Sequence, residues 1–222
     1  MIYLFRILLF FSFILSFESL LAGQWELIDK NTLSFEGEIT PEEYEAFIPY
    51  YDKSINRLIL NSGGGETYAA LKIANKLISQ IDVVIVDGIC GSSCANYLFT
   101  IGKKKIIKSH SLVGYHGNVT AMMSEWDILE SDLINQGISS GQILEIKNYM
   151  DMQVEIEREF FLSLGISQEL FDRSYQADKG MGDMKSYSLL APTVESFLLY
   201  GIDNIFGEQD IDVANQINSV VD

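Results

Sequence analysis

A serine-bearing turn and a histidine downstream of it are the parts of this sequence whose residue types could do chemistry together. The turn, residues 90–94, reads CGSSC, and His116 follows a short apolar segment at 112–115. A serine hydroxyl is a poor nucleophile at neutral pH and needs a base within hydrogen-bond reach, which a histidine can provide. This pairing predicts nucleophilic catalysis in which Ser92 or Ser93 attacks the substrate.

A glycine-rich loop upstream could complete such a site. Residues 62–65 read SGGG and come directly after an apolar segment at 57–60. Glycines let the backbone approach a substrate closely, so that its N–H groups can bind the oxyanion created by serine attack. The chain has one other histidine, His110, which lies in a polar stretch and is expected to be solvated. Without the serine turn, His116 would be interpreted as a strand-end histidine with structural hydrogen bonds only.

The elements that must position these residues follow from the hydrophobic pattern. Apolar runs at 57–60 and 82–86 predict buried strands, and the apolar spacing over 66–81 predicts a helix between them. The serine turn is followed by a helical segment at 97–101, and two further strands are expected before His116. This alternation of strands and helices predicts an α/β fold with a mainly parallel sheet.

The chain changes character after His116. Residues 118–164 contain long periodic stretches that predict helices, with an apolar stripe typical of a core or a subunit interface. Further helices are expected at 167–174 and from an opening at 190–193 to 200–201, and a closing strand at 202–206.

The N-terminal residues have the pattern of a secretory signal peptide. A short basic start precedes an apolar run at 7–17, which is shorter than the ~20 residues that span a bilayer, and small residues follow up to Ala22. We expect residues 1–22 to be a signal peptide and the mature protein to be periplasmic or secreted. A retained leader would instead anchor the chain at the membrane. Residues 23–208 are expected to form one domain and residues 209–222 a flexible tail.

Charge and cysteine content narrow the function classes. The formal net charge of -16 argues against a nucleic-acid partner, because phosphate binding requires clustered Lys and Arg. No cofactor is indicated, and the two cysteines, Cys90 and Cys94, are too few for a zinc site. In an oxidising compartment they could form a disulfide, and otherwise they would be two small buried residues.

Taken in order, the motifs resemble the ClpP/crotonase-like superfamily of serine peptidases, the group of the Clp protease proteolytic subunit and signal peptide peptidase A. The motifs are SGGG at 62–65, CGSSC at 90–94, GYH at 114–116 and YGID at 200–203. The nearest resemblance is to a poorly characterised branch of secreted or periplasmic proteins with a C-x-S-x-C turn. It implies a crotonase-like (ClpP-type) fold, a repeated ββα superhelix with a mainly parallel sheet and a helical segment after the catalytic histidine.

The resemblance also implies roles for individual residues. Ser92 falls at the position of the nucleophile and His116 at that of the general base, while Gly65 and Ser93 fall where oxyanion-hole N–H groups are donated. Ser93 stays an alternative nucleophile.

The third catalytic position is open. The family usually carries an acid that orients the histidine, after the helical segment. The spacing here contains an insertion that leaves Asp172, Ser174 and Asp183 as candidates. A serine–histidine dyad can work without this residue.

The sequence therefore predicts an extracytoplasmic serine peptidase that hydrolyses peptide bonds in peptides or proteins. The resemblance implies a homo-oligomer, with the helices of residues 118–164 as contact surface. Two alternatives are a catalytically inactive binding or scaffold protein of the same fold, and a crotonase-type enzyme acting on an acyl-thioester. The scarcity of basic residues for the phosphates of coenzyme A disfavours the second alternative.

Overall fold

The fold is built on one sheet. The computed structural model describes residues 23–179 and 189–210. Within these residues the seven strands follow the order β1-β2-β3-β4-β5-β7, and β6 pairs with β4 beside this path. The strands are β1 (Gln24–Asp29), β2 (Thr32–Ile39), β3 (Arg57–Gly65), β4 (Val83–Gly91), β5 (Lys104–Ile107), β6 (Leu112–Gly114) and β7 (Ile205–Phe206). Among them β1 and β2 pair antiparallel and the other pairs are parallel, which confirms the predicted mainly parallel sheet.

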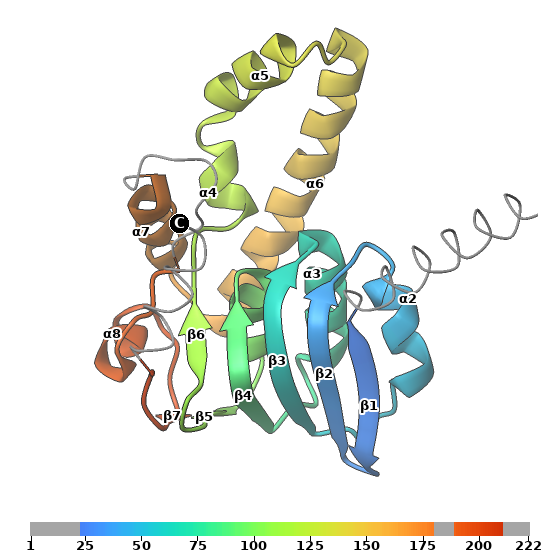
Figure 1. Ribbon diagram of the computed structural model, residues 1–222, viewed down its shortest axis with the longest axis vertical. Helices are drawn as coiled ribbons and strands as arrows, with labels where there is room; N and C mark the ends of the chain where they lie inside the picture. The colour runs from blue at the N-terminus through green and yellow to red at the C-terminus, as the bar shows by residue number, and fades with distance from the viewer. Residues whose placement is uncertain (1–22, 180–188, 211–222) are drawn as a thin grey trace, which may run out of the picture.

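Helices connect the parallel strands and then gather after the last residues of β6. The helices are α2 (Glu43–Phe47), η1 (Ile48–Tyr50), α3 (Thr67–Leu77), the π-helix η2 (Cys94–Phe99), α4 (Val119–Met123), α5 (Trp126–Asn135), α6 (Ser140–Leu164), α7 (Glu169–Lys179) and α8 (Val194–Leu199). Figure 1 shows β6 pointing toward α4, while α5 and the first half of α6 project beyond the sheet. The predicted α/β fold with a helical segment after His116 is confirmed.

Strand β4 changes partner halfway along its length. Residues 83–86 pair with β5, and residues 89–91 pair with β6. Between the two halves Gly88 has a φ of 122°, and a side chain there would meet Asn61. The Asn61 Oδ1 accepts a hydrogen bond from the Ile89 N–H at 3.0 Å, at the bend in the strand. The bend lets β4 run beside both β5 and β6, the strand that leads to His116.

Helix α6 links the projecting helices to the core. It begins with a capping box at Ser139 and ends at Gly165, whose φ of 70° is the left-handed conformation typical of a helix C-terminus. Near this end Phe160 and Phe161 pack on the ring of Tyr97, the first edge-to-face and the second stacked. The helix is therefore fixed directly behind η2, the element that follows the serine turn.

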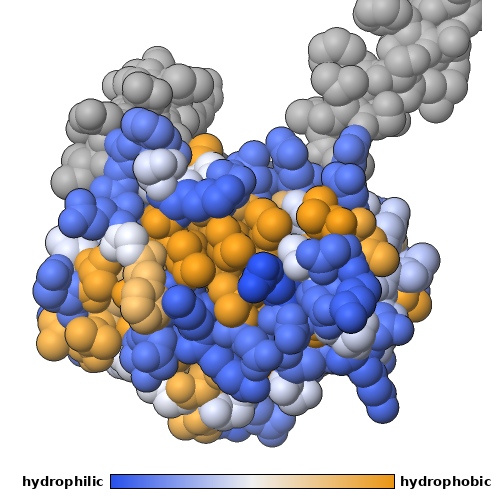
Figure 2. All heavy atoms as spheres, turned by 90° about the horizontal axis from the view of Figure 1, so that it is seen from below, coloured by the Kyte–Doolittle hydropathy of each residue, from blue (hydrophilic) through white to orange (hydrophobic). Residues whose placement is uncertain are grey.

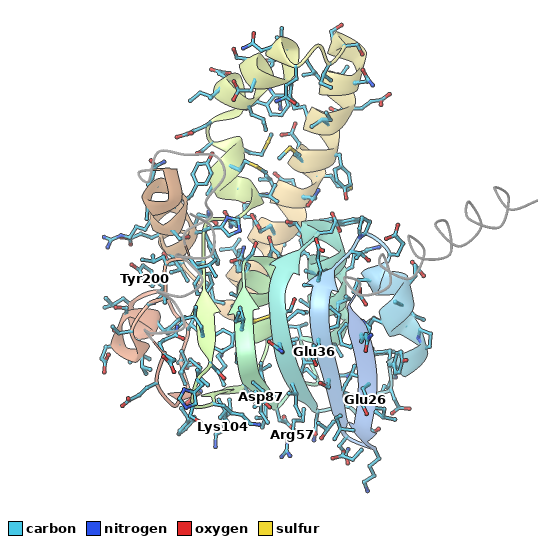
Figure 3. All side chains as sticks on the ribbon, in the orientation of Figure 1. Glu26, Glu36, Arg57, Asp87, Lys104 and Tyr200 are labelled. Atoms are coloured by element: carbon cyan, nitrogen blue, oxygen red, sulfur yellow. A yellow bond between two sulfur atoms is a disulfide. The ribbon has the colours of Figure 1, made fainter. Side chains whose placement is uncertain are left out.

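The sheet is covered unequally on its two faces. In β3 the side chains of Leu58 and Leu60 are fully buried, while Arg57 is exposed and Ile59 half-buried. Figure 3 labels charged side chains on five neighbouring strands of the sheet: Glu26, Glu36, Arg57, Asp87 and Lys104. Seen from below, Figure 2 shows an apolar patch bordered by hydrophilic residues.

The ends of the chain are described only in part. The predicted signal peptide, residues 1–22, lies outside the described residues, as do residues 211–222 of the predicted tail. The first residue of that tail, Gln209, uses its side-chain amide to bond both the N–H and the carbonyl of Val113, each at 2.8 Å. In the described part of the chain, the length and apolarity needed to cross a bilayer are not met by any helix.

Candidate active site

Ser92 lies in the turn between β4 and η2. Its φ of 52° is in the left-handed region, which is uncommon for a residue with a side chain and is often found at functional sites. Its N–H donates to the Gly114 carbonyl at 3.0 Å, and its carbonyl accepts from the Asn96 N–H at 2.8 Å. The first bond continues the pairing of β4 with β6, and the second begins the following helix. The serine thus occupies a sharp strand-to-helix turn with its side chain half-buried.

His116 reaches Ser92 because β4 and β6 are neighbours. Gly91 and Gly114 pair in the parallel register, so the residues after each strand emerge at the same edge of the sheet. The His116 Nε2 lies 2.7 Å from the Ser92 Oγ. At this distance the imidazole can take the hydroxyl proton as a general base. The structure therefore brings together the serine and the histidine that the motifs single out.

The glycine-rich loop lies against the serine turn. Ser62 at the end of β3 pairs with Cys90, and its Oγ accepts a hydrogen bond from the Gly64 N–H at 3.1 Å. Gly64 has a φ of 101°, and a Cβ there would lie 2.7 Å from the Ser92 Cβ and 2.9 Å from the Ser93 nitrogen. No side chain fits at this position. The sequence singles out the glycine run as a whole, but only the structure identifies Gly64 as the residue that touches the turn.

The two predicted oxyanion-hole residues are neighbours. The Ser93 Oγ donates to the Gly65 carbonyl at 3.1 Å, which fixes the Gly65–Glu66 peptide against the serine turn. Ser93 is buried, and its hydroxyl is used in this bond. Of the two serines in the turn, Ser92 is thus the one whose hydroxyl contacts His116. The donation of N–H groups to an oxyanion by Gly65 and Ser93 stays a prediction.

The cysteines on either side of the turn are bonded to each other. Cys90 and Cys94 form a disulfide in the structure, with their Cα atoms 5.3 Å apart and both side chains fully buried. The bond joins the end of β4 to the first residue of η2 and therefore encloses Ser92.

The candidates for the third catalytic position have other roles or lie outside the described residues. The Asp172 carboxylate accepts a hydrogen bond from Gln168 at 3.0 Å and is exposed. Ser174 is fully buried, and its hydroxyl donates to the Phe171 carbonyl at 3.0 Å. Asp183 lies outside the described residues. The third position stays open.

His110 lies apart from this site. It is exposed, has a φ of 60°, and its Nδ1 lies 2.9 Å from the Asp210 carboxylate. The loop that contains it precedes β6, whereas His116 follows that strand. His110 is thus solvated, as expected, although its pairing with Asp210 has no signal in the sequence.

A segment remote in sequence borders the site. Leu190 forms an antiparallel bridge with Tyr115, with N–H···O bonds of 2.9 and 2.7 Å. Beside it, the Leu189 side chain lies over Gly91 and Gly114, where added Cβ atoms would meet it at 3.2 and 2.7 Å. Gly91 and Gly114, the paired last residues of β4 and β6, therefore leave room for the Leu189 side chain beside the site.

A buried amide ties the two catalytic segments together. The Asn96 Nδ2, one turn after Ser92, donates to the Gly117 carbonyl at 2.9 Å. Both residues are buried, and Gly117 comes directly after His116. A polar residue within the apolar run CANYLF is the only sequence signal for this contact.

The titratable groups behind the site are strongly affected by burial. Burial raises the pKa of the Tyr97 hydroxyl well above its usual range, and the nearby Glu157 carboxylate raises it further. Burial also raises the pKa of Glu157, although hydrogen bonds from Thr120 and Tyr97 oppose this shift. Across the described residues, His, Cys, Asp and Glu side chains do not gather into a group of three that could hold a metal ion.

Comparisons with known proteins give structural likeness only. No protein-family model matches the chain, and no curated protein matches it. Among solved structures, ClpP1 from Listeria monocytogenes has 16% identity and a TM-score of 0.48, and covers 84% of this chain and 96% of its own. A point mutant of that protein has 16% identity and a TM-score of 0.46, and the match covers 85% of this chain and 96% of the mutant's chain. The ClpP protease catalytic domain from Plasmodium falciparum has 15% identity and a TM-score of 0.46, and the match covers 80% of this chain and 85% of that domain's chain.

Proposed function

We propose that this protein is a serine peptidase in which Ser92 is the nucleophile and His116 the general base. The observation that carries the proposal is the 2.7 Å contact between the Ser92 Oγ and the His116 Nε2, made at the end of adjacent parallel strands. The left-handed turn at Ser92 and the glycine loop packed against it support the same conclusion.

The reaction follows from the roles of these groups. The Ser92 Oγ attacks the carbonyl carbon of a peptide bond while the His116 Nε2 takes the hydroxyl proton. The N–H groups of Gly65 and Ser93 bind the oxyanion of the tetrahedral intermediate. The C–N bond then breaks as His116 returns the proton to the leaving amine, and an acyl ester stays on Ser92. A water molecule deprotonated by His116 hydrolyses this ester and restores the free serine.

The protein acts outside the cytoplasm. The predicted signal peptide, residues 1–22, supports this location, and the disulfide between Cys90 and Cys94 suits an oxidising compartment. N-terminal sequencing of the protein purified from its native compartment tests the location. A mature chain that starts at Gly23 supports it, whereas a chain that keeps residues 1–22 indicates a membrane-anchored form.

The protein forms homo-oligomers through its projecting helices. Exposed large apolar side chains on α5 and the first half of α6 support this proposal: Ile128, Ile134 and Leu144. Light scattering after size exclusion tests it, since a monomeric mass at micromolar concentration would contradict an oligomer.

Hydrolysis of unstructured peptides tests the activity itself. We would incubate the mature, oxidised protein with a mixture of synthetic peptides and detect new termini by mass spectrometry. Cleavage that falls ~10³-fold or more in Ser92→Ala and His116→Ala is expected. A folded wild-type protein that cleaves no peptide and reacts with no serine-directed reagent would indicate the scaffold function instead.

A further inference from the structure

Helix α6 carries a carboxylate that is completely buried behind the candidate active site. Glu157 has no exposed surface, and its two oxygens face different elements. The Oε1 accepts a hydrogen bond from the Tyr97 hydroxyl, and the Oε2 accepts from the Thr120 N–H at 2.9 Å and from the Thr120 hydroxyl. Each oxygen is therefore committed to one partner residue.

The two partners lie in the helices that follow the two candidate catalytic residues. Tyr97 belongs to η2, the helix that begins two residues after Ser92. Thr120 belongs to the first turn of α4, which begins three residues after His116. Glu157 thus joins the helix that follows the serine to the helix that follows the histidine.

Joining the two helices through a buried carboxylate has a free-energy cost. Removing a charged group from water costs several kcal/mol unless hydrogen bonds compensate for the lost solvation. Here the compensation requires both partners at once, because one oxygen depends on Tyr97 and the other on Thr120. A shift of η2 relative to α4 would leave part of the carboxylate without a donor. The arrangement is therefore stable in one relative position of the two helices.

We propose that Glu157 is a positioning residue that holds the Ser92 hydroxyl and the His116 imidazole at hydrogen-bond distance. This inference rests on the proposed function, because it assigns Glu157 a role in the same site without contact to substrate. The direct bond from Asn96 to the Gly117 carbonyl acts in parallel on the same two segments. Glu157 adds the long helix α6 as a rigid brace between them.

Three substitutions test whether the hydrogen bonds of Glu157 to Tyr97 and Thr120, rather than general packing, position the catalytic pair. Glu157→Gln keeps the shape but offers one acceptor oxygen in place of two, so one partner loses its acceptor. Tyr97→Phe and Thr120→Val remove only one hydroxyl each and keep the ring stacking and the β-branched shape. The matched control is Glu159→Gln, a carboxylate on the same helix that is exposed to solvent.

The first readout is the rate of reaction with a fluorophosphonate probe, measured on folded protein. We expect Glu157→Gln, Tyr97→Phe and Thr120→Val each to lower the rate constant on the order of tenfold, because small displacements of reacting groups are costly. The control Glu159→Gln should react at the wild-type rate. Wild-type rates in all three folded variants would overturn the proposal.

The second readout does not depend on enzymatic activity. The chain has two histidines, so a His110→Gln background leaves His116 as the only source of imidazole signals in a ¹⁵N NMR spectrum. At a pH where the ring is neutral, Ser92→Ala should displace the Nε2 resonance, because it removes the hydroxyl 2.7 Å away. If Glu157 positions the pair, the same Ser92→Ala change should displace the resonance much less in the Glu157→Gln background.

The outcomes distinguish this inference from the proposed function. An equal Nε2 displacement with and without Glu157 would overturn the positioning role, even in an active enzyme. The wild-type protein could fail to react with the probe while Ser92→Ala displaces the Nε2 resonance only in the background that keeps Glu157. That result would overturn the peptidase function and support the positioning role. No displacement in the wild-type background would overturn the positioning role, since there would be no contact to position. Should Glu157→Gln fail to fold, Tyr97→Phe and Thr120→Val take its place in both readouts.

Discussion

The backbone at Ser92 is held in the left-handed region by the groups around it. Its N–H is bonded to the Gly114 carbonyl, and the disulfide of Cys90 and Cys94 encloses it. A non-glycine residue in this conformation costs of order 1 kcal/mol or more, which the surrounding structure must supply. In return the serine side chain leaves the strand at an angle that reaches His116.

Gly64 gives a direct test of how closely the glycine loop must approach this serine. Its φ of 101° and the 2.6 Å between an added Cβ and the Gly91 carbonyl oxygen leave no room for alanine. We expect Gly64→Ala to destabilise the protein by about 1–3 kcal/mol and to lower probe labelling at least tenfold. Chemical denaturation and labelling rates measure the two effects.

The neighbouring glycine serves as the matched control. An added Cβ at Gly63 meets nothing within 4 Å, and its φ is not in the left-handed region. Gly63→Ala should therefore keep both stability and labelling within about 0.5 kcal/mol and twofold of wild type. Equal behaviour of the two variants would mean that the loop does not pack on the turn as described.

At the residue scale, much of the candidate site could be predicted from local motifs. The CGSSC turn, the SGGG loop and the strand-end histidine identified residues that the structure brings together at Ser92 and His116. Glu157 could not be found in this way, because helix α6 contains several glutamates with the same spacing and its partners are remote in sequence. The residue that orients the histidine could not be identified, because an insertion before it means that the spacing from His116 no longer points to one position.

At the scale of elements, the turn from β4 into η2 depends on its disulfide. A bond between residues this close in sequence removes about 2 kcal/mol of unfolded-state entropy in the chain-entropy model. We expect the double variant Cys90→Ala with Cys94→Ala to lose about this stability and to react more slowly with the probe, because the turn around Ser92 is freer. Denaturation curves of the double variant and of the reduced wild type should coincide.

The comparison depends on whether Cys90 and Cys94 are oxidised or reduced. Both side chains are fully buried, so reduction of the folded protein should be slow and require a denaturant. An oxidised protein that is no more stable than the double variant would contradict a bracing role for the bond between Cys90 and Cys94.

The elements themselves were largely predictable from periodicity. The buried β-branched run at 82–86 became the first half of β4, and the spacing over 66–81 became α3. The bridge between Tyr115 and Leu190 was not predictable, because a single paired residue leaves no alternating pattern. The helix expected to open within residues 190–193 starts at Val194, directly after Thr193, whose hydroxyl accepts the Ser196 N–H as its cap.

At the scale of the whole molecule, buried carboxylates give stability a defined pH dependence. Glu43 is buried and accepts a hydrogen bond from the Trp25 Nε1 at 2.7 Å, and burial raises its pKa, as it does for Glu157. A raised pKa means that the folded protein keeps a proton that the unfolded chain loses. The free energy of unfolding should therefore fall as pH rises from about 4.3 toward the raised values.

Glu43→Gln tests this pH dependence without removing the acceptor of Trp25. The variant lacks the ionisation, so its free energy of unfolding should fall less steeply with pH, by up to about 1.4 kcal/mol per pH unit. Urea denaturation from pH 4 to pH 8 measures both slopes. Asp29 and Asp52 act in the opposite direction below this window, since backbone hydrogen bonds from Asn31 and Ser54 lower their pKa. Parallel curves for variant and wild type would contradict the burial of an ionisable Glu43.

The most direct test of the central claim is covalent labelling of the oxidised, mature protein with a fluorophosphonate, with the adduct located by peptide mass spectrometry. The proposed function predicts an adduct on Ser92 that is absent from Ser92→Ala and His116→Ala and retained in Ser93→Ala. An adduct on Ser93, or a folded wild-type protein that carries no adduct, would contradict the assignment of Ser92 and His116 as a catalytic pair.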